Sequence, residues 1–500
     1  MTNGYTTNGF TQAGGTGPAS RPPSAAQAKD LARDHFDVII VGAGTSGLNV
    51  ARELSNAGLR CLGLEAGTRY DRKSYPAREV DSSSQLFWGG GVELTTNVSL
   101  ALLRPKVVGG GSIVNQALMD RFDDVALEDF RRTSGVDFFN TDDLHAYYER
   151  AETCINIEEV PEDHRNGNAA LFAEGFEANG YEYKRLRRGE QDCRFEEGNC
   201  CIECLSGCRI DSKQSSAITA LPTAEEHGFE LLDRTEVRTI EERSDGVAVH
   251  AQIGPVQGPK VELTFRASRV VLASGAIGNS ALMLRSGFGA QLPALGTNFY
   301  CHPQYMNIGV YNHKIRAWDG PLQNYKSNDP GFRRQGFKLE NVFAGPASIA
   351  LLVPGYGAQH SEVMTDFENL GCIEVCVRDT NPGRISVNRH GDPVIKKKLN
   401  REDARRRAAG MTAIRNIFNA TGAQRIVEGE FGIGLHLMGG LGIGIDRNRS
   451  VVNPDFRIHG SQRIYAADSS IFPNAPGINP ALTISALSHK ASDIIASEAR

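Results

Sequence analysis

The first strong hydrophobic run in the chain is FDVIIV at residues 36–41, and the glycine-rich sequence GAGTSG follows it directly. Apolar residues then recur at helical spacing from Leu48 to Ala57, and LRCLGLEAG at 59–67 has the pattern of a second short strand. A strand, a helix and a second strand in this order predict a βαβ unit with parallel strands.

Related patterns recur much later in the chain. Short strands are predicted between residues 229 and 273, and RIYAAD at 463–468 has the pattern of another strand. Helices are predicted over 142–155, 401–422 and 479–500. We therefore expect one α/β sheet drawn from three distant segments, with a strand-rich region around 300–430 inserted over its face.

The composition of the chain argues against several classes of protein. The 500 residues are 40% hydrophobic and 23% charged, which predicts a soluble globular protein of two domains or one large interleaved unit. The net charge of −5, without a basic stripe, argues against nucleic acid as a partner. No apolar run approaches the roughly 20 residues of a transmembrane segment. Residues 1–35 lack a secretory signal and read as a disordered tail, so we expect a cytoplasmic protein.

The sequence GAGTSG places Gly42, Gly44 and Gly47 in the G-x-G-x-x-G spacing of dinucleotide-binding proteins. The first glycine permits a tight turn, the second lets the backbone approach a pyrophosphate, and the third lets helix and strand pack closely. Glu65 ends the second strand, where a carboxylate can bind the two ribose hydroxyls. The same charge would repel the 2′-phosphate of NADP. A glycine-rich turn in a purely structural βαβ unit is the alternative.

Three consecutive glycines in VVGGGSIVNQ, residues 107–116, indicate a second place where backbone approaches a ligand closely, or else an irregular turn. His436 lies in the apolar sequence GIGLHLMGG and is either a buried core residue or a group kept for proton transfer. Asn479 precedes Pro480 where a helix is expected to start, so it can be an N-cap, a functional residue, or both. Asp468 ends a predicted strand.

Cysteines are dense between residues 193 and 208. Cys200, Cys201, Cys204 and Cys208 could ligate a metal or an iron–sulfur cluster, although their spacing fits no standard ferredoxin run. The alternative is reduced thiols packed in the interior, and ten cysteines without an export signal favour it over a disulfide framework. We expect no iron and no other metal site.

These blocks together resemble the glucose–methanol–choline (GMC) oxidoreductases over most of residues 36–500. VIIVGAGTSGL with GLEAG is similar to the family's FAD entry motif, and VGGGSIVN and GAIGNSALMLRSGFG are similar to its two signatures. LGTNFYCH and HLMGG…RIYAADSSIFPNAPGINPALTISAL resemble its later blocks. The motifs are nearest to cholesterol oxidase-like proteins and bacterial FAD-dependent alcohol and sugar dehydrogenases. Asn279 stands where Ser or Thr is usual in the second signature.

The resemblance implies a Rossmann-like FAD-binding domain formed by residues 36–119, 193–300 and 432–500. Residues 120–192 and 301–431 would form an inserted α+β substrate-binding region built on an antiparallel sheet. FAD would be noncovalent, because VVGGGSIVNQ holds no histidine or cysteine that could form a link. Contacts to the cofactor are implied for Gly42, Gly44, Thr45, Ser46, Gly47, Glu65, Gly110, Ser112, Asn115, Val237, Asp468 and Pro480.

The implied reaction oxidises an alcohol to a carbonyl by hydride transfer to flavin N5. His436 would be the general base, with an ordinary pKa of about 6.5, and Asn479 would position the substrate oxygen. The substrate would be a small alcohol, and the electron acceptor could be oxygen, a quinone or a redox protein. No counterpart of a substrate-binding carboxylate is identified. Two alternatives are an FAD-containing lyase of the same fold and a catalytically silent flavin-binding protein.

Overall fold

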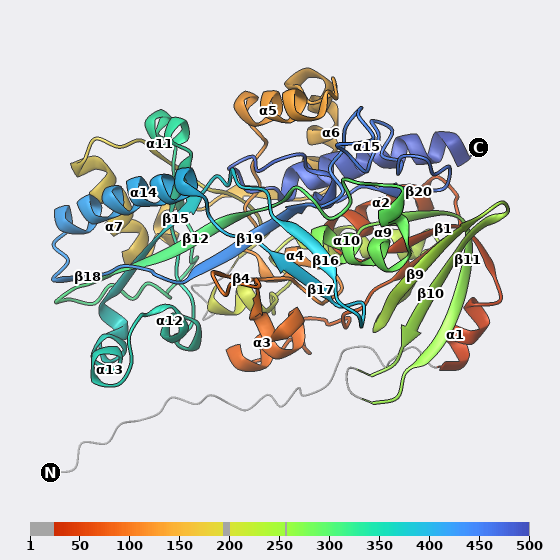
Figure 1. The fold of residues 1–500 in the computed structure, drawn as a ribbon. Coiled ribbons are helices and arrows are strands. Elements are labelled where there is room, and N and C mark those ends of the chain that lie inside the picture. Colours follow the sequence, from red (N-terminus) through yellow and green to blue (C-terminus); the bar gives the residue numbers. More distant parts are fainter. Residues whose placement is uncertain (1–24, 194–200, 256–257, 500) are drawn as a thin grey trace, which may run out of the picture.

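A computed structural model of the chain describes residues 25–193, 201–255 and 258–499. Two sheets dominate it and lie next to each other (Figure 1). The first sheet and its helices occupy one end of the molecule. The second sheet, with its own covering helices, forms the other end, and long excursions of the chain connect the two.

The first sheet has the strand order β8-β2-β1-β11-β10-β9, with β20 on β11. Strands β8, β2, β1, β11 and β20 run parallel, whereas β9, β10 and the first half of β11 form an antiparallel meander. The strands are β1 (His35–Val41), β2 (Cys61–Leu64), β8 (Glu230–Leu232), β9 (Thr235–Arg243), β10 (Gly246–Ile253), β11 (Val261–Leu272) and β20 (Ile464–Ala466).

The parallel strands are almost wholly apolar and buried, as strands covered on both faces must be. Helix α2 (Thr45–Asn56) follows β1, α10 (Gly275–Arg285) follows β11, and α15 (Ala481–Ala499) packs against α2. The expected sheet built from three distant segments is therefore confirmed, and with its helices it has the predicted α/β architecture.

The second sheet has the order β3-β4-β19-β12-β15-β14-β13-β6, with β18 on β12, and is antiparallel except between β4 and β19. Its strands are β3 (Glu93–Leu94), β4 (Leu100–Leu102), β6 (Tyr183–Arg185), β12 (Phe299–Val310), β13 (Tyr325–Ser327), β14 (Phe337–Asn341), β15 (Leu370–Val377), β18 (Arg425–Val427) and β19 (Gly432–Gly439). Helices α7 (Gly167–Ala178) and α14 (Arg401–Ala420) pack on one face, and the opposite face is left for a cavity.

Other elements connect or decorate these layers. The helices are α1 (Ala25–Leu31), α3 (Glu79–Leu86), α4 (Gly111–Val114), α5 (Asp124–Ser134), α6 (Thr141–Thr153), α8 (Ser216–Thr219), α9 (Leu221–Glu226), α11 (Pro330–Gln335), α12 (Pro346–Leu352) and α13 (Ala358–Thr365). Two small antiparallel pairs are β5 (Ile157–Glu159) with β7 (Arg187–Gly189), and β16 (Arg384–Val387) with β17 (Pro393–Lys396).

Two boundaries differ from the sequence prediction. Residues 25–31 of the expected tail form helix α1, because Ala28 and Leu31, three positions apart, bury one face against the first core. Residues 1–24 lie outside the described residues. Strands β3, β4 and β19, in segments assigned to the FAD-binding domain, belong instead to the second sheet, where β19 lies between β4 and β12. The remaining domain limits stay a prediction.

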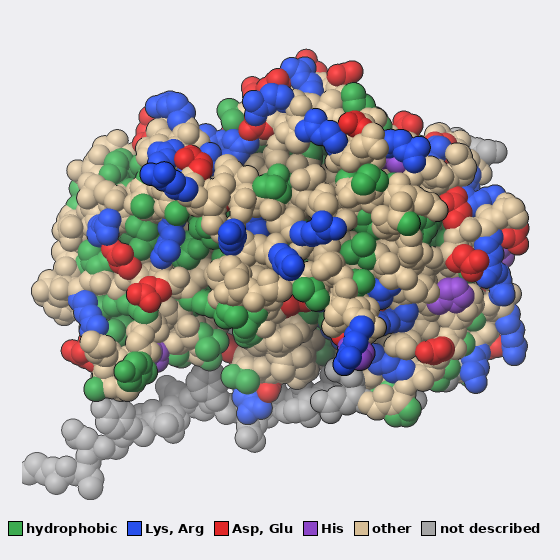
Figure 2. Space-filling view, viewed as in Figure 1, with side chains coloured by type: hydrophobic (Ala, Val, Ile, Leu, Met, Phe, Trp, Pro, Cys, Tyr) green, Lys and Arg blue, Asp and Glu red, His purple; other side chains and the backbone are tan. Residues whose placement is uncertain are grey.

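Basic and acidic side chains are interspersed on the face that Figure 2 shows, in keeping with the small net charge. Among the helices that the structure describes, we find none long and apolar enough to cross a lipid bilayer.

Candidate active site

A cavity of about 760 Å³ extends between the two sheets. One end is lined by the β1–α2 loop, the end of β2, and β9. The other end is lined by β12, β14, β15 and β19, together with the residues before α15. The cavity therefore joins the predicted nucleotide site to the residues expected to carry the chemistry.

At the end of the cavity where a nucleotide is predicted to bind, backbone segments of the two glycine loops lie in close contact. A Cβ at Gly47 would lie 1.9 Å from the carbonyl oxygen of Gly42, so only glycine fits there. A Cβ at Gly110 would lie 2.8 Å from the Cα of Gly44, which shows that the two glycine loops touch. Gly44 and Thr45 line the cavity where α2 starts, and no side chain caps that helix end. Its free N–H groups can therefore bind an anion.

Glu65 lines the same end of the cavity, and its carboxylate accepts the N–H groups of Ala43 (2.8 Å) and Gly67 (2.7 Å). Burial raises the pKa of Glu65, and these two N–H groups oppose the shift. Val237 also lines the cavity. The glycine loop and the ends of β2 and β9 thus meet at one place, as a nucleotide site requires.

The remaining expected cofactor residues divide into two groups. Ser46, Asn115, Asp468 and Pro480 line the cavity. Ser112 does not: its hydroxyl donates to the carbonyl of Gly109 at 2.6 Å, so it supports the glycine loop from behind.

Asn279, which replaces the usual Ser or Thr, has a defined role. Its Nδ2 donates to both carboxylate oxygens of Asp468, at 2.9 and 3.1 Å, and its Oδ1 accepts the N–H of Ser274 at 3.0 Å. The N–H of Gly275, at the start of α10, also donates to Asp468. Asn279 therefore fixes the Asp468 carboxylate at the cavity wall.

His436 lies on a β-bulge. Strand β12 pairs Tyr300 with Met438 and His302 with Leu435, so two residues of β19 oppose one of β12. His436 adopts a left-handed φ of +52°, which is uncommon for residues other than glycine, and its side chain lines the cavity. The buried core residue Phe456 also has a positive φ, so it is the position of His436 at the cavity, and not its backbone conformation, that favours the functional alternative.

His302 is the neighbour that holds His436. The Nδ1 atoms of the two rings are 2.9 Å apart, and the N–H of Gly477 donates to His302 Nε2 at 3.0 Å. Burial and the charge of Lys338 lower the pKa of His436 to about 3. Burial and the adjacent His436 lower the pKa of His302 well below its usual value. Both rings are therefore neutral at physiological pH.

Asn479 reaches the same end of the cavity but is not an N-cap. Helix α15 begins at Ala481, and the carbonyl of Pro480 accepts its first helical bond from Ile484 at 2.9 Å. The Asn479 Oδ1 accepts a hydrogen bond from Lys338 on β14. Lys338 also donates to Glu340 at 2.6 Å.

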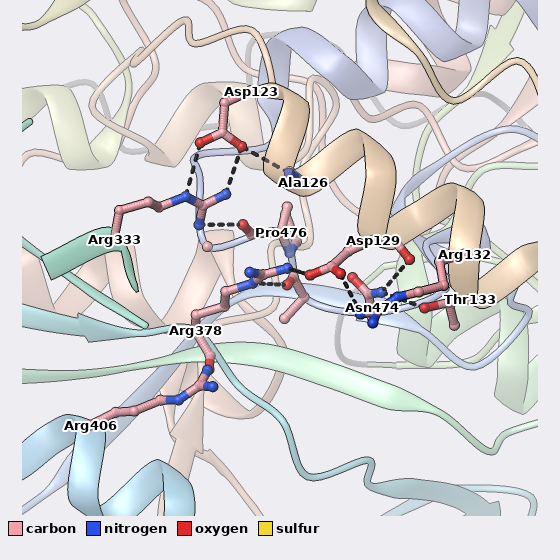
Figure 3. A network of polar contacts seen from close by, with 12 residues as sticks. Asp123, Ala126, Asp129, Arg132, Thr133, Arg333, Arg378, Arg406, Asn474 and Pro476 are labelled. Atoms are coloured by element: carbon pink, nitrogen blue, oxygen red, sulfur yellow. Dashed lines mark hydrogen bonds and ion pairs between the residues drawn. The ribbon is translucent and has the colours of Figure 1, made fainter. Parts of the chain in front are cut away.

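Two arginines fix the loop that precedes Asn479 (Figure 3). Arg333 donates to the carbonyl of Pro476 at 2.9 Å and forms a two-point ion pair with Asp123, at 2.9 and 2.7 Å. Arg378 donates to the carbonyl of Ala475 at 3.0 Å and pairs with Asp129 on α5. Arg333 lies on α11 and Arg378 directly follows β15, so both belong to the end of the molecule that contains the second sheet.

Sequence reasoning missed His302, Lys338, Glu340 and Glu374. His302 ends the quoted block LGTNFYCH but was given no role. A visible signal existed for Glu374, which is an isolated acid within the apolar run LGCIEVCV at 370–377. Strand pairing sets Glu374 opposite Glu340, and both line the cavity.

The cysteine stretch is described only in part. Cys200 and the side chain of Cys201 lie outside the part of the chain that the structure describes. Cys204 is buried, and its backbone carbonyl accepts from the buried Lys213, which also donates to the Asn115 carbonyl at 3.0 Å. No metal-binding group of three or more ligands and no disulfide occurs among the described residues.

Comparison with known proteins gives a consistent result. The family profile described as GMC oxidoreductase matches its N-terminal part to residues 83–304 and its C-terminal part to residues 379–488. An uncharacterised GMC-type oxidoreductase of Sinorhizobium fredii is 27% identical over 491 residues, covering 91% of this chain and 93% of the relative. The long-chain-alcohol oxidase FAO4B of Arabidopsis thaliana is 25% identical over 511 residues, covering 90% and 66%.

Among solved structures, pyridoxine 4-oxidase from Mesorbium loti has the same fold. Its TM-score is 0.67 with 15% sequence identity, over 92% of this chain and 99% of that one.

Proposed function

Because this chain belongs to the GMC oxidoreductase family, we propose that it oxidises the alcohol group of a small molecule to a carbonyl, using noncovalently bound FAD. One observation carries the proposal. His436 from the second sheet and Asn479 from the loop before α15 both line a cavity that also contains a glycine-bounded nucleotide site. That arrangement suits a redox cofactor between a phosphate-binding loop and a polar reacting centre.

The residues present fit FAD. The free helix end at Gly44 suits the pyrophosphate, Glu65 suits the ribose hydroxyls, and Asp468 suits the ribityl chain. Bound FAD would accept the hydride. Asn115 lines the cavity, and its carbonyl accepts a hydrogen bond from the buried Lys213.

Asn479 acts as a donor in this proposal. Its Oδ1 already accepts from Lys338, so its Nδ2 hydrogens are the groups left for a substrate oxygen. Lys338 thereby positions the amide of Asn479. A donated hydrogen bond stabilises the negative charge that grows on the substrate oxygen as its proton leaves.

His436 can act as a general base in this chain only after its ring changes tautomer. Gly477 donates to His302 Nε2, so neutral His302 keeps its proton on Nδ1 and donates it to His436. Resting His436 then carries its own proton on Nε2 and is a donor. To take the hydroxyl proton at Nε2, His436 must first adopt the tautomer with its proton on Nδ1, which requires His302 to release Gly477.

Anaerobic reduction of the flavin tests the function. The holoenzyme should lose its yellow colour when mixed with an alcohol from a panel of 1-pentanol, xylitol and benzyl alcohol, and the matching aldehyde or ketone should appear. His436→Ala should retain FAD and bleach much more slowly. Bound flavin that no member of the panel bleaches would contradict the proposal and would favour the lyase or the silent binding protein. Admission of air then shows whether oxygen is the acceptor. The cytoplasmic location stays a prediction.

A further inference from the structure

The cavity wall formed by β12, β14 and β15 carries three polar side chains beside the apolar Met306. Strands β12, β15 and β14 are neighbours there, and the pairing places Met306 opposite Glu374 and Glu374 opposite Glu340. Gln304, two residues from Met306, lies on the same face of β12. Gln304, Glu374 and Glu340 all line the cavity although each is almost fully buried.

Two polar atoms of this wall lack a hydrogen-bond partner among the described residues. They are Oε1 of Gln304 and Oε1 of Glu374, and these residues are 2% and 1% exposed. Because buried polar groups in proteins are normally hydrogen-bonded, two such atoms at the cavity lining indicate that a bound ligand supplies the partners.

The wall carries no net charge. The Lys338 ammonium compensates the Glu340 carboxylate, and despite burial it holds the pKa of Glu340 below its usual value. Burial and the adjacent Glu340 charge raise the pKa of Glu374 well above its usual value, so Glu374 is protonated. A neutral acid and a neutral amide recognise hydroxyl groups, whereas an ionic ligand group would find no opposite charge to pair with.

The spacing fixes where a hydroxyl group would bind. Gln304 follows His302 by two residues on one strand, which corresponds to about 7 Å along the wall. Glu374 is one strand further from His436, diagonally across from Gln304. A hydroxyl bound there would be several carbon–carbon bonds away from the carbon that is oxidised.

We propose that Gln304 and Glu374 bind a second hydroxyl group of the substrate, so that the protein acts on a small uncharged polyol in preference to a simple alcohol. The inference rests on the proposed alcohol oxidation and adds the substrate class. An apolar chain in this position would leave the polar atoms of Gln304 and Glu374 buried without partners, and sites built to bind a hydroxyl discriminate strongly against analogues that lack it.

The test compares three five-carbon probes, 1-pentanol, 1,5-pentanediol and xylitol, by anaerobic flavin reduction of the holoenzyme. We expect the ratio of reduction rate to dissociation constant to rise in that order, with xylitol exceeding 1-pentanol by about 10²-fold or more. Gln304→Leu and Glu374→Met should each lower the value for xylitol by roughly three- to tenfold and leave that for 1-pentanol unchanged or higher.

Glu374→Gln keeps a neutral polar group and should retain most of the preference for xylitol. Gln424→Leu, the same exchange as Gln304→Leu but at an exposed position in the loop after α14, is the matched control. Equal bleaching by 1-pentanol and xylitol, unchanged by either wall substitution, would overturn the polyol assignment while leaving alcohol oxidation intact. Failure of all three probes and of benzyl alcohol to bleach the flavin would overturn alcohol oxidation itself.

Discussion

The Nδ1 atoms of His302 and His436 lie 2.9 Å apart, so one ring must donate to the other. The Gly477 N–H on His302 Nε2 decides the direction, and it leaves neutral His436 with its proton on Nε2. The tautomer of the expected catalytic histidine is thus set by a second histidine and one backbone amide.

This arrangement can be observed directly. In protein with ¹⁵N-labelled histidine, the ring-nitrogen chemical shifts at pH 7 should identify His302 as protonated on Nδ1 and His436 as protonated on Nε2. His302→Phe should remove the preference and leave His436 as a mixture of tautomers. A proton on Nδ1 of His436 in the wild-type protein would refute the assigned chain and would show His436 already poised as a base.

The pH dependence of flavin reduction should reflect the lowered pKa of His436. Its neutral form is present above a pKa of about 3 and is lost only as the pH falls through that value, so the rate should be flat between about pH 5 and pH 9. Lys338→Met removes the positive charge that disfavours protonation, so its inflection should move upward. Lys398→Met, at an exposed lysine, should keep the flat profile. An inflection near pH 6.5 in the wild type would contradict the lowered pKa of His436.

Substitution of the two expected catalytic residues should separate their roles. His436→Ala should slow flavin reduction by about 10²–10⁴-fold while FAD content stays unchanged, because proton transfer is lost but the glycine loops and Asp468 are not altered. Asn479→Ala should slow hydride transfer and keep the flat pH profile, since it removes positioning and not a titrating group. Stopped-flow absorbance of the flavin measures both rates, and wild-type speed in His436→Ala would remove this residue from the chemistry.

Glu65→Gln should weaken FAD binding by about 1.5–3 kcal/mol, because hydrogen bonds to a charged carboxylate are replaced by weaker ones. Titration of the apoprotein with FAD, followed by flavin fluorescence, gives the affinity. Glu368→Gln, at an exposed position of the substrate half, is the control and should bind FAD as the wild type does. If Glu65→Gln binds FAD with unchanged affinity, the carboxylate serves only the loop amides of Ala43 and Gly67.

The cysteine stretch calls for a metal assay. We expect no stoichiometric iron and no acid-labile sulfide in anaerobically purified protein, because the spacing from Cys200 to Cys208 fits no standard cluster run. Cys204→Ser should then keep its FAD content. Iron and sulfide in constant ratio to protein, both lost in Cys204→Ser, would establish a cluster.

The sequence predicted the features that depend on neighbouring residues and missed those that depend on contacts between distant segments. The strand 36–41 with GAGTSG, the acid at Glu65 and the closing helix are local patterns, and each was found close to where it was expected. His302 and Glu374 acquire their positions from strand pairing between segments more than sixty residues apart. No local sequence pattern predicts how these strands pair. None predicts the β-bulge at His436 either.

The arginine clamp on the loop before Asn479 has a consequence for how the enzyme can fail. Arg333 and Arg378 come from the end of the molecule that contains the second sheet, whereas the carbonyls they bind lead directly to Gly477, Asn479 and helix α15, which packs against α2 beside the first sheet. The hydrogen bonds from Arg333 and Arg378 therefore join the two ends of the molecule and also hold Gly477 and Asn479 in position. If the second sheet moved away from helix α15, the Gly477 amide would leave His302 and Asn479 would leave Lys338 at the same time. Separation of the two ends of the molecule would therefore abolish activity as soon as it occurred.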